Sequence, residues 1–379
     1  MSKRVYVVAG ELSGDAHGAG LLRSLMEMVP DLEIHGVGGP EMAQVAGSGL
    51  KDWVEDAAVM GVWEVLKHYG WFKQRFAEML ADLKKIQPHV LLLIDYPGFN
   101  LRFAEAVKRE CPGTRIIYYI SPKVWAWNKK RIPVMARLLD EVLCLFPFEP
   151  PIFAKAGLKA TFVGNPLVDE LEGKRIPGVQ RDELLVGLFP GSREREVALL
   201  FPMMIESAKR LKSWKPELKF EVPAASVKLA EQIRSLMSEA GAGAGGLVTI
   251  TNGGSHSLMQ RACCAVIASG TATLEAGYYG LPYCLVYRIA PSTYLVAKMV
   301  VKIELIGLVN ILAGEEVVEE LVQAKAEPVA VSRSLREFLE SPAKREALQA
   351  RLAETSAKLG GKGAHDRAAR AVAGWLKQP

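Results

Sequence analysis

The sequence predicts an α/β protein made of two doubly wound, Rossmann-like domains, each with a mainly parallel sheet between layers of helices. Two observations predict this fold class. Residues 4–29 and 184–211 share one layout, in which a short apolar strand leads through a loop of small residues into an amphipathic helix. Residues 172–178, between them, are polar and rich in turn formers, as in a linker between domains. The 379 residues suffice for two domains, because one domain usually takes about 150.

The predicted strands are short, largely apolar runs separated by helical stretches, as is usual for parallel strands covered on both faces. In the first half they are residues 4–8, 33–37, 89–94, 115–120, 141–145 and 160–163. In the second half they are residues 184–189, 218–222, 247–251, 265–268 and 282–287. The tail, residues 332–378, has the apolar spacing of two or three helices.

These elements define the expected domains. The first domain spans residues 1–171, the linker residues 172–183 and the second domain residues 184–355. We expect a C-terminal helix at residues 356–379, and its packing back across the domain junction is left as an open alternative.

Charge and composition argue against several classes of protein. The 47 Lys and Arg residues exceed the 42 Asp and Glu residues by 5, too few to indicate nucleic-acid binding but compatible with an anionic ligand or membrane surface. The five cysteines form no C-x-x-C pair, which disfavours disulfides and structural zinc and favours a reducing compartment. The first residues lack the apolar core of a signal peptide, and charges interrupt the longest apolar stretch, residues 294–312. We therefore expect a cytoplasmic protein without a membrane-spanning helix.

Candidate functional residues of the first half lie in loops that follow strands, where parallel sheets bind their ligands. Ser13, Gly14 and Asp15 open the first helix, where free backbone amides attract a polar ligand. Asp95 follows five consecutive apolar residues. Burial there would raise its pKa and suit it to act as a general base, with a loop or N-capping aspartate as the alternative. Trp125 stands beside a second tryptophan and four cationic side chains, which suits either a sugar or phosphate platform or a core position.

The second half has two loops that open a helix directly after a strand. They are Gly191-Ser192-Arg193 and Ser269-Gly270-Thr271. Backbone amides, the helix dipole and the guanidinium of Arg193 together suit a diphosphate. Glu275 lies one turn, about 5.4 Å, inside the second helix, from where its carboxylate could accept hydrogen bonds from two ribose hydroxyls. Two such loops with an acid at this offset predict a nucleoside-diphosphate site.

Several cofactor and metal signatures are missing from the sequence. Neither the G-x-G-x-x-G spacing nor an acidic residue after the second strand is present, which disfavours a dehydrogenase. The Walker loop and the D-x-D triplet are absent, and the six histidines show no ligand-like spacing. We expect neither a cofactor nor a metal site.

Residues 60–73 combine apolar and aromatic side chains with cationic ones, as helices at a membrane surface do. Residues 294–306 are similar, and core helices with lysines at their rim are the alternative for both segments. The side chains expected to contact membrane or acyl chains are Met60, Val62, Trp63, Leu66, Trp71 and Phe72.

Six motifs in order along the chain resemble those of the lipid A disaccharide synthase family. They are Gly10-Glu11-Leu12-Ser13-Gly14-Asp15, Ile94-Asp95-Tyr96-Pro97-Gly98-Phe99-Asn100, Ser121-Pro122-Lys123-Val124-Trp125-Ala126-Trp127, Pro190-Gly191-Ser192-Arg193, Ala268-Ser269-Gly270-Thr271 and Asn310-Ile311-Leu312-Ala313-Gly314. The resemblance implies a bacterial, metal-independent, inverting glycosyltransferase of GT-B architecture, with two Rossmann-like domains facing across a cleft.

The implied reaction transfers 2,3-diacylglucosamine from UDP to the 6-hydroxyl of 2,3-diacylglucosamine 1-phosphate, giving the β-1,6-linked lipid A disaccharide 1-phosphate and UDP. The resemblance assigns Asp95 as the catalytic carboxylate and Arg193 as the essential arginine beside the diphosphate. It places Ser269, Gly270, Thr271 and Glu275 at the UDP site, Asn310 in a further motif near the cleft, and Asn100 with the loop residues that face the acceptor. The implied enzyme binds the anionic inner membrane surface peripherally, and a homodimer is an open alternative.

The chain departs from the commoner family forms at Asn165-Pro166 and at Lys123, which affects local contacts only. Two alternative functions remain. One is another UDP-N-acetylglucosamine enzyme of the same fold, either a cell-wall transferase or an epimerase. The other is a lipid-binding protein regulated by a nucleotide and without turnover.

Overall fold

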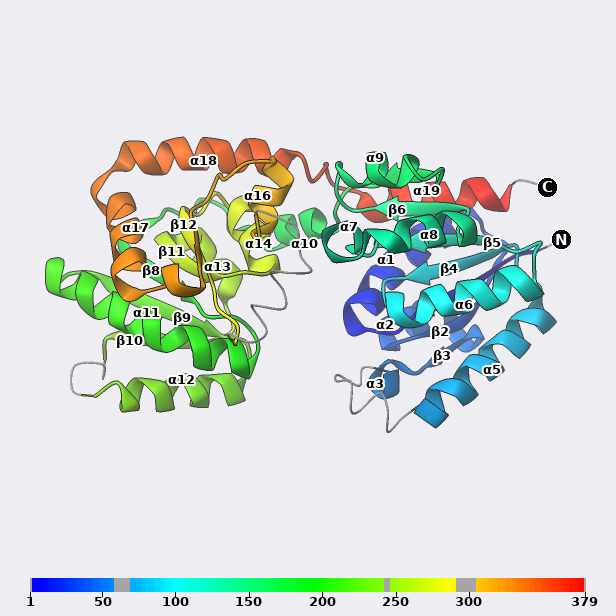
Figure 1. Ribbon diagram of the computed structural model, residues 1–379, viewed down its shortest axis with the longest axis horizontal. Helices are drawn as coiled ribbons and strands as arrows, with labels where there is room; N and C mark the ends of the chain where they lie inside the picture. Colours follow the sequence, from blue (N-terminus) through cyan, green and yellow to red (C-terminus); the bar gives the residue numbers. More distant parts are fainter. Residues whose placement is uncertain (1, 58–68, 242–245, 291–304, 378–379) are drawn as a thin grey trace. The chain divides into compact units, whose positions relative to one another are not determined.

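The structure is a computed structural model, and it describes residues 2–57, 69–241, 246–290 and 305–377. The chain divides into two compact units. One comprises Met1–Pro166 with Leu359–Pro379, and the other comprises Leu167–Lys358. Each unit is a doubly wound α/β fold with a parallel sheet, which confirms the predicted fold class (Figure 1).

The first unit has a seven-stranded sheet in the order β3-β2-β1-β4-β5-β6-β7. Its strands are β1 (Lys3–Ala9), β2 (Leu32–Gly38), β3 (Leu50–Asp52), β4 (Val90–Ile94), β5 (Arg115–Tyr119), β6 (Glu141–Cys144) and β7 (Ala160–Phe162). Its helices are α1 (Leu12–Met28), α2 (Pro40–Ala46), α3 (Val54–Ala57), α5 (Tyr69–Ile86), α6 (Pro97–Glu110), α7 (Val124–Trp127), α8 (Ile132–Leu138), α9 (Glu149–Ala154) and α19 (Ala364–Leu376).

The second unit has a six-stranded sheet in the order β10-β9-β8-β11-β12-β13. Its strands are β8 (Asp182–Phe189), β9 (Lys219–Ala224), β10 (Val248–Asn252), β11 (Ala262–Ala268), β12 (Tyr283–Tyr287) and β13 (Glu320–Val322). Its helices are α10 (Leu167–Gly173), α11 (Glu194–Trp214), α12 (Val227–Glu239), α13 (Ser255–Arg261), α14 (Thr271–Tyr278), α16 (Leu308–Ala313), α17 (Pro328–Glu340) and α18 (Pro342–Ala357).

The side chains along each strand point alternately to the two faces of the sheet. Both faces are buried, which explains why the strands are continuous apolar runs in the sequence. In β1, Tyr6 and Val8 belong to the core beneath α5 and α6, whereas Val5 and Val7 belong to the core beneath α1. The predicted strands are all confirmed, and among the residues that the structure describes only the short edge strands β3 and β13 went unpredicted. Each of these two strands buries only one side chain and includes charged residues, Lys51 and Asp52 in β3 and Glu320 in β13, so neither forms an apolar run.

The end of the chain completes the core of the first unit. Helix α19 packs along α1, and its inward side chains share a core with Val5, Leu22 and Ile117 (Figure 1). The Trp375 Nε1–H donates to a carboxylate oxygen of the buried Glu141 at 2.5 Å. The last predicted helix is thus an integral part of the first unit.

Candidate active site

In the first unit, three predicted functional loops lie side by side. Strand β4 is paired with β1 on one side and with β5 on the other, with Ala9 opposite Ile94 and Ile94 opposite Tyr119. Because the strands are parallel, the loops after all three open at the same carboxyl edge of the sheet. Ser13, Asp95 and the segment that leads to Trp125 therefore share one edge.

Asp95 is held in an unusual backbone conformation. Its φ is +46° and that of Tyr96 is +49°, so two consecutive residues other than glycine adopt the left-handed region. Such a conformation costs about 1–3 kcal/mol per residue and persists only where surrounding contacts enforce it. The Asp95 carbonyl accepts hydrogen bonds from the Tyr118 hydroxyl and, at 2.7 Å, from Asn100 Nδ2, and its N–H donates to the Tyr119 carbonyl at 3.0 Å. These contacts fix the backbone from which the carboxylate extends.

The charge state of Asp95 depends on burial and on one cation. Burial raises the pKa of its carboxyl group above the ordinary value of an aspartate, while a hydrogen bond from the Tyr96 amide and the charge of Lys123 lower it. A half-buried carboxylate with a raised pKa at the mouth of a strand can accept a proton from a hydroxyl. The geometry therefore suits Asp95 for the predicted base role.

Glu11 is a neighbouring acid that the sequence did not single out. Burial and the charge of Asp95 both raise the pKa of the Glu11 carboxyl group. It directly precedes α1, in the loop after the strand paired with β4. Its position beside Asp95 could have been inferred only from the pairing of β1 with β4, since about 80 residues separate the two acids in the chain.

The Asp15 side chain stabilises the fold and does not contact the open edge of the sheet. Its side chain is 1% exposed, and its two carboxylate oxygens accept hydrogen bonds from the backbone N–H groups of Gly39, Glu41 and Met42 at 2.8, 2.9 and 3.0 Å. These are the free amides at the start of α2. We therefore move Asp15 from the ligand-contacting residues to the residues that position the loop.

Asn100 and Trp125 are also buried beneath the edge. Asn100 Nδ2 donates to the carbonyls of Ile94 and Asp95, and Trp125 Nε1 donates to Glu149 at 3.0 Å. Glu149, which the sequence did not indicate, is 1% exposed, and burial raises the pKa of its carboxyl group. Of the alternatives for Trp125, the structure favours the core position.

In the second unit, the two predicted phosphate loops are adjacent. Strand β8 pairs with β11, with Phe189 opposite Ile267, so the loops after these strands open at the same edge. Arg193 immediately precedes α11, and its side chain is 76% exposed and pairs with Glu196 at 2.8 Å. Gly191 has a φ of +110°, and a Cβ atom there would lie 2.4 Å from Glu196 Oε2. Only glycine fits this turn without displacing the acid.

The second loop is ordered by its own backbone and hydroxyl groups. The Ser269 N–H donates to the Val286 carbonyl at 3.0 Å, and the Thr273 hydroxyl donates to the Gly270 carbonyl at 2.7 Å. Gly270 and Thr271 are exposed at the start of α14, where backbone amides remain available to an anion. The structure thus brings Arg193 and this helix start to one edge.

Glu275 lies one turn inside α14 and is half-buried. Burial and the charge of Glu170 raise the pKa of the Glu275 carboxyl group, and the charge of Lys174 lowers it. Both neighbours come from the segment that opens the second unit.

Both polar atoms of the Asn310 side chain form hydrogen bonds within the fold. Its Nδ2 donates to the Val318 carbonyl and to Glu320, each at 2.8 Å, and its Oδ1 accepts from the N–H groups of Val317 and Val318 at 2.9 Å. At 1% exposure it has no remaining donor or acceptor for a nucleotide. We therefore regard Asn310 as a residue that shapes α16 and the segment before β13.

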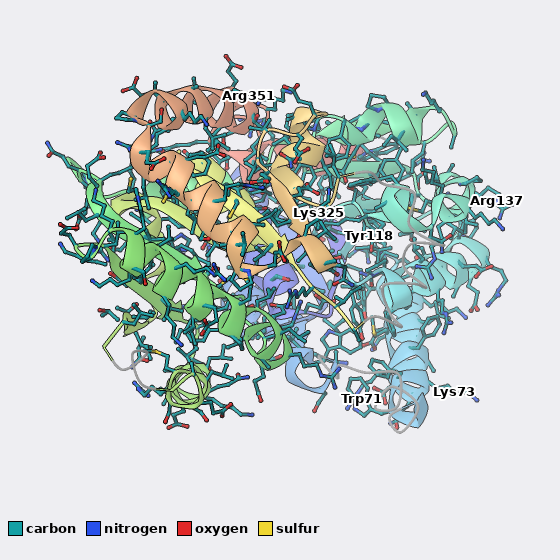
Figure 2. The ribbon with its side chains drawn as sticks, turned by 60° about the vertical axis from the view of Figure 1, so that its left-hand side comes forward. Trp71, Lys73, Tyr118, Arg137, Lys325 and Arg351 are labelled. Carbon is teal, nitrogen blue, oxygen red and sulfur yellow. The ribbon has the colours of Figure 1, made fainter. Side chains whose placement is uncertain are left out.

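The predicted membrane-contacting residues fall into two groups. Met60, Val62, Trp63 and Leu66 lie outside the described residues, as does most of 294–306. Trp71 and Phe72 lie in the first turn of α5 and are half-buried. Figure 2 labels Trp71 at this end of the helix. The Trp71 ring stacks on Trp53 with centroids 5.8 Å apart and meets Phe72 edge to face at 4.9 Å. Both rings therefore pack on the core while keeping an exposed side.

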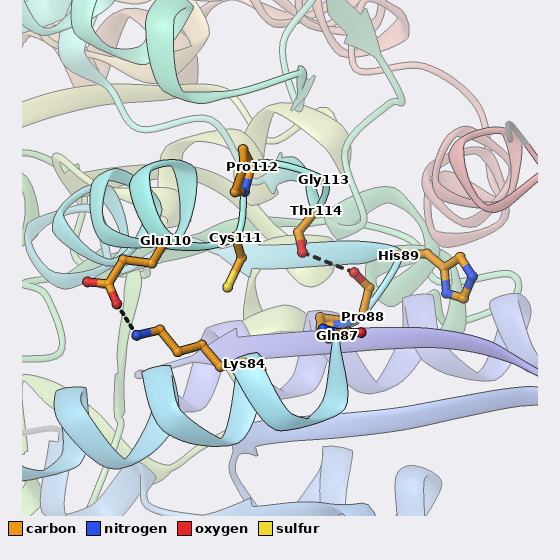
Figure 3. A pocket seen from close by; sticks show the side chains of 9 residues that line it. All are labelled: Lys84, Gln87, Pro88, His89, Glu110, Cys111, Pro112, Gly113 and Thr114. Atoms are coloured by element: carbon orange, nitrogen blue, oxygen red, sulfur yellow. Dashed lines mark hydrogen bonds and ion pairs between the residues drawn. The ribbon is translucent and has the colours of Figure 1, made fainter.

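A hollow of about 530 Å³ lies at the opposite edge of the first sheet, where β4 and β5 begin (Figure 3). Its charged groups neutralise each other, because Lys84 forms an ion pair with Glu110. Burial raises the pKa of the Cys111 thiol in its wall, which makes that cysteine a poorer nucleophile. This hollow shares no residue with the candidate active site.

Within the described residues, no cluster of three or more His, Cys, Asp or Glu side chains is arranged to hold a metal ion. None of the described helices has the length and apolar character to cross a membrane.

Comparison with known proteins points to one family. A family model described as "Lipid-A-disaccharide synthetase" matches residues 5–373. A lipid-A-disaccharide synthase from Geobacter sulfurreducens is 39% identical over 98% of this chain and 97% of its own length. Another, from Myxococcus xanthus, is 36% identical over 97% of this chain and 96% of its own. The fold is similar to that of a UDP-GlcNAc 2-epimerase from Neisseria meningitidis bound to UDP-GlcNAc, with a TM-score of 0.60 at 13% identity, covering 98% of this chain and 99% of that one.

Proposed function

Since the chain belongs to the lipid-A-disaccharide synthetase family, we propose that its two units divide the work of one glycosyl transfer, with the base in the first unit and the UDP site in the second. The reaction forms the lipid A disaccharide. In it, 2,3-diacylglucosamine passes from UDP to the 6-hydroxyl of 2,3-diacylglucosamine 1-phosphate. The bond between the anomeric carbon and the UDP oxygen breaks, and a bond to the acceptor oxygen forms on the opposite face of the sugar.

The observation that carries the proposal is the half-buried carboxylate of Asp95, which extends from a fixed backbone. It takes the proton of the acceptor hydroxyl as that oxygen attacks, and its raised pKa makes it a stronger base than an exposed aspartate. Tyr118 and Asn100 hold its backbone, which keeps the residue at the end of β4 during the reaction. The exposed Ser13 beside buried Gly14 leaves this edge open to the acceptor.

The second unit stabilises the leaving UDP. The electron pair of the broken bond goes to the β-phosphate, and Arg193 with the amides at the starts of α11 and α14 offsets the negative charge that develops there. Gly191, Ser192, Ser269, Gly270 and Thr271 form the walls of this diphosphate site. Glu275, one turn inside α14, accepts hydrogen bonds from the ribose hydroxyls.

The decisive experiment incubates the full chain with the UDP-diacylglucosamine donor and the monosaccharide 1-phosphate acceptor. We expect a disaccharide and an equal amount of UDP. Asp95→Asn should lower kcat at least about a hundredfold, as the loss of a general base does, with UDP affinity unchanged. Asp31→Asn, in an exposed turn, is the matched control. Near wild-type transfer by Asp95→Asn would remove the base role.

Arg193→Ala should lower kcat by slowing departure of UDP, with the exposed Arg234→Ala as its control. An unchanged kcat would exclude a role for Arg193 in the transition state. A C2-epimerised UDP-N-acetylglucosamine instead of a disaccharide would favour the epimerase alternative. Binding of UDP without any turnover would favour the non-catalytic one.

We also propose that residues 60–76 hold the enzyme peripherally on the cytoplasmic face of an anionic inner membrane and admit the acyl chains. The half-buried aromatic rings of Trp71 and Phe72, next to exposed Lys73, support this (Figure 2). Replacing Val62, Trp63 and Leu66 with serine should weaken sedimentation with anionic vesicles. Unchanged sedimentation would assign the segment to the core.

A further inference from the structure

A histidine of the second unit faces the carboxylate proposed to bind ribose. His256 on α13 places its Nδ1 atom 4.0 Å from Oε2 of Glu275 on α14. Both side chains are mostly buried, with 22% and 19% of their surfaces exposed. The imidazole ring also meets the Tyr279 ring edge to face, with centroids 6.0 Å apart, which limits its rotation.

Lys174 determines which nitrogen of His256 carries the proton. The Lys174 ammonium lies 3.2 Å from His256 Nε2. An ammonium group can only donate, so Nε2 must accept and the proton of the neutral ring sits on Nδ1. Nδ1 is buried and has no hydrogen-bond partner among the described residues. The Nδ1–H group is therefore available to the nearby carboxylate.

Gln260 fixes the distance between the lysine and the histidine. Its Nε2 donates to the carbonyls of Lys174 and His256, each at 3.0 Å, and its Oε1 accepts from the Ile176 N–H at 2.8 Å. The segment that follows α10, polar in sequence, is thus bound to α13 beside the candidate UDP site. Its fixed position is one that the sequence, read as a linker, did not indicate.

Burial and the neighbouring charges favour the neutral form of the His256 ring and disfavour the ionised form of Glu275. Burial and the charge of Lys174 lower the pKa of His256, with Glu170 opposing them. Glu170 forms an ion pair with Lys174 at 2.5 Å and also raises the pKa of Glu275. A neutral donor can bind the Glu275 carboxylate without adding a buried charge.

We propose that His256 is a positioning residue for the nucleotide sugar: a small rotation lets its Nδ1–H donate to Glu275 and hold that carboxylate against the ribose hydroxyls. This rests on the proposed role of Glu275 at the ribose. Lys174 supports the same arrangement by holding the required tautomer. Through Lys174, the binding of ribose would also depend on the segment that opens the second unit.

The test compares UDP with 2′,3′-dideoxy-UDP, which lacks the hydroxyls, by calorimetric titration of the full chain. His256→Phe keeps the ring that packs on Tyr279 but removes the donor. We expect it to weaken UDP binding roughly tenfold, the size of one hydrogen bond to a charged group, and to leave dideoxy-UDP binding within about twofold. His256→Asn, whose amide nitrogen can replace Nδ1–H, should recover most of the UDP affinity.

His35→Phe is the matched control, because His35 also faces a carboxylate, that of Glu33 at 3.8 Å, but lies in the first unit. It should change neither affinity. Equal losses for both nucleotides in His256→Phe would indicate a packing role and overturn the proposal, as would no loss at all. Equal binding of UDP and dideoxy-UDP by the wild-type chain would instead overturn the ribose role of Glu275 itself.

Discussion

Asp15 provides a sharp test of whether a motif residue serves the fold or the substrate. Its carboxylate accepts three backbone hydrogen bonds, two on Oδ1 from Gly39 and Met42 and one on Oδ2 from Glu41. Asp15→Ala would leave all three amides at the start of α2 without an acceptor. Asp15→Asn would keep an oxygen for the first two but turn an NH₂ group toward the Glu41 amide.

The magnitude follows from the number of donors left unpaired. A buried donor without an acceptor costs about 1–3 kcal/mol, and the Glu41 amide, which is only partly buried, costs least. Asp15→Ala should therefore destabilise the first unit by about 3–5 kcal/mol and Asp15→Asn by about 1–2 kcal/mol. In a unit of this size, about 3 °C of Tm per kcal/mol gives a fall of roughly 10 °C for Asp15→Ala.

Thermal unfolding followed by circular dichroism measures this fall, with disaccharide formation assayed well below the transition. We expect a graded loss of Tm, Ala more than Asn, and a much smaller loss of kcat/KM. Asp31→Ala, in an exposed turn, should leave Tm within about 1 °C, as surface substitutions usually do. The reasoning is refuted if Asp15→Ala keeps the wild-type Tm while kcat/KM falls a hundredfold, because the carboxylate would then act on the substrate.

Three further predictions concern the base, the diphosphate loop and the C-terminal helix. Because Asp95 must be ionised to accept a proton, kcat/KM should fall as the pH falls through the pKa of Asp95. Lys123→Gln removes a cation that lowers this pKa, so the acidic limb of the pH profile should move to higher pH. An acidic limb that does not move would contradict this role of Lys123. Gly191→Ala places a Cβ against Glu196 in a left-handed backbone, so KM for the UDP donor should rise about tenfold or more. The backbone strain of about 1–3 kcal/mol should also lower Tm by roughly 3–9 °C. An unchanged KM would show that the loop does not contact the donor. Deleting residues 359–379 uncovers the apolar core that α19 shares with α1. The truncated chain should therefore lose the unfolding transition of the first unit and aggregate. A wild-type Tm would contradict the packing of α19 on α1.

The sequence alone determined the fold class, every strand with a substantial apolar run, and the loops in which the candidate residues lie. Strand β4 is the clearest case, because the five apolar residues before Asp95 predicted a buried strand and all five are buried in β4. Burial of apolar side chains follows a local period along the chain, so it can be predicted from neighbouring residues. The two short edge strands, β3 and β13, lack that signal.

Only the tertiary structure decided what each polar residue of those loops does. Asp15, Asp95 and Asn310 all belong to motifs at the ends of strands or starts of helices. The side chains of Asp15 and Asn310 are nevertheless hydrogen-bonded within the fold, whereas the Asp95 carboxylate lies at the open edge. The hydrogen-bond donors to Asp15 lie 24 to 27 residues away in the chain, and α19 packs on α1 from the other end of the sequence. Hydrogen bonds and packing between distant segments produce no periodic pattern in the sequence, because they depend on where separate elements meet in space. They therefore cannot be predicted from neighbouring residues.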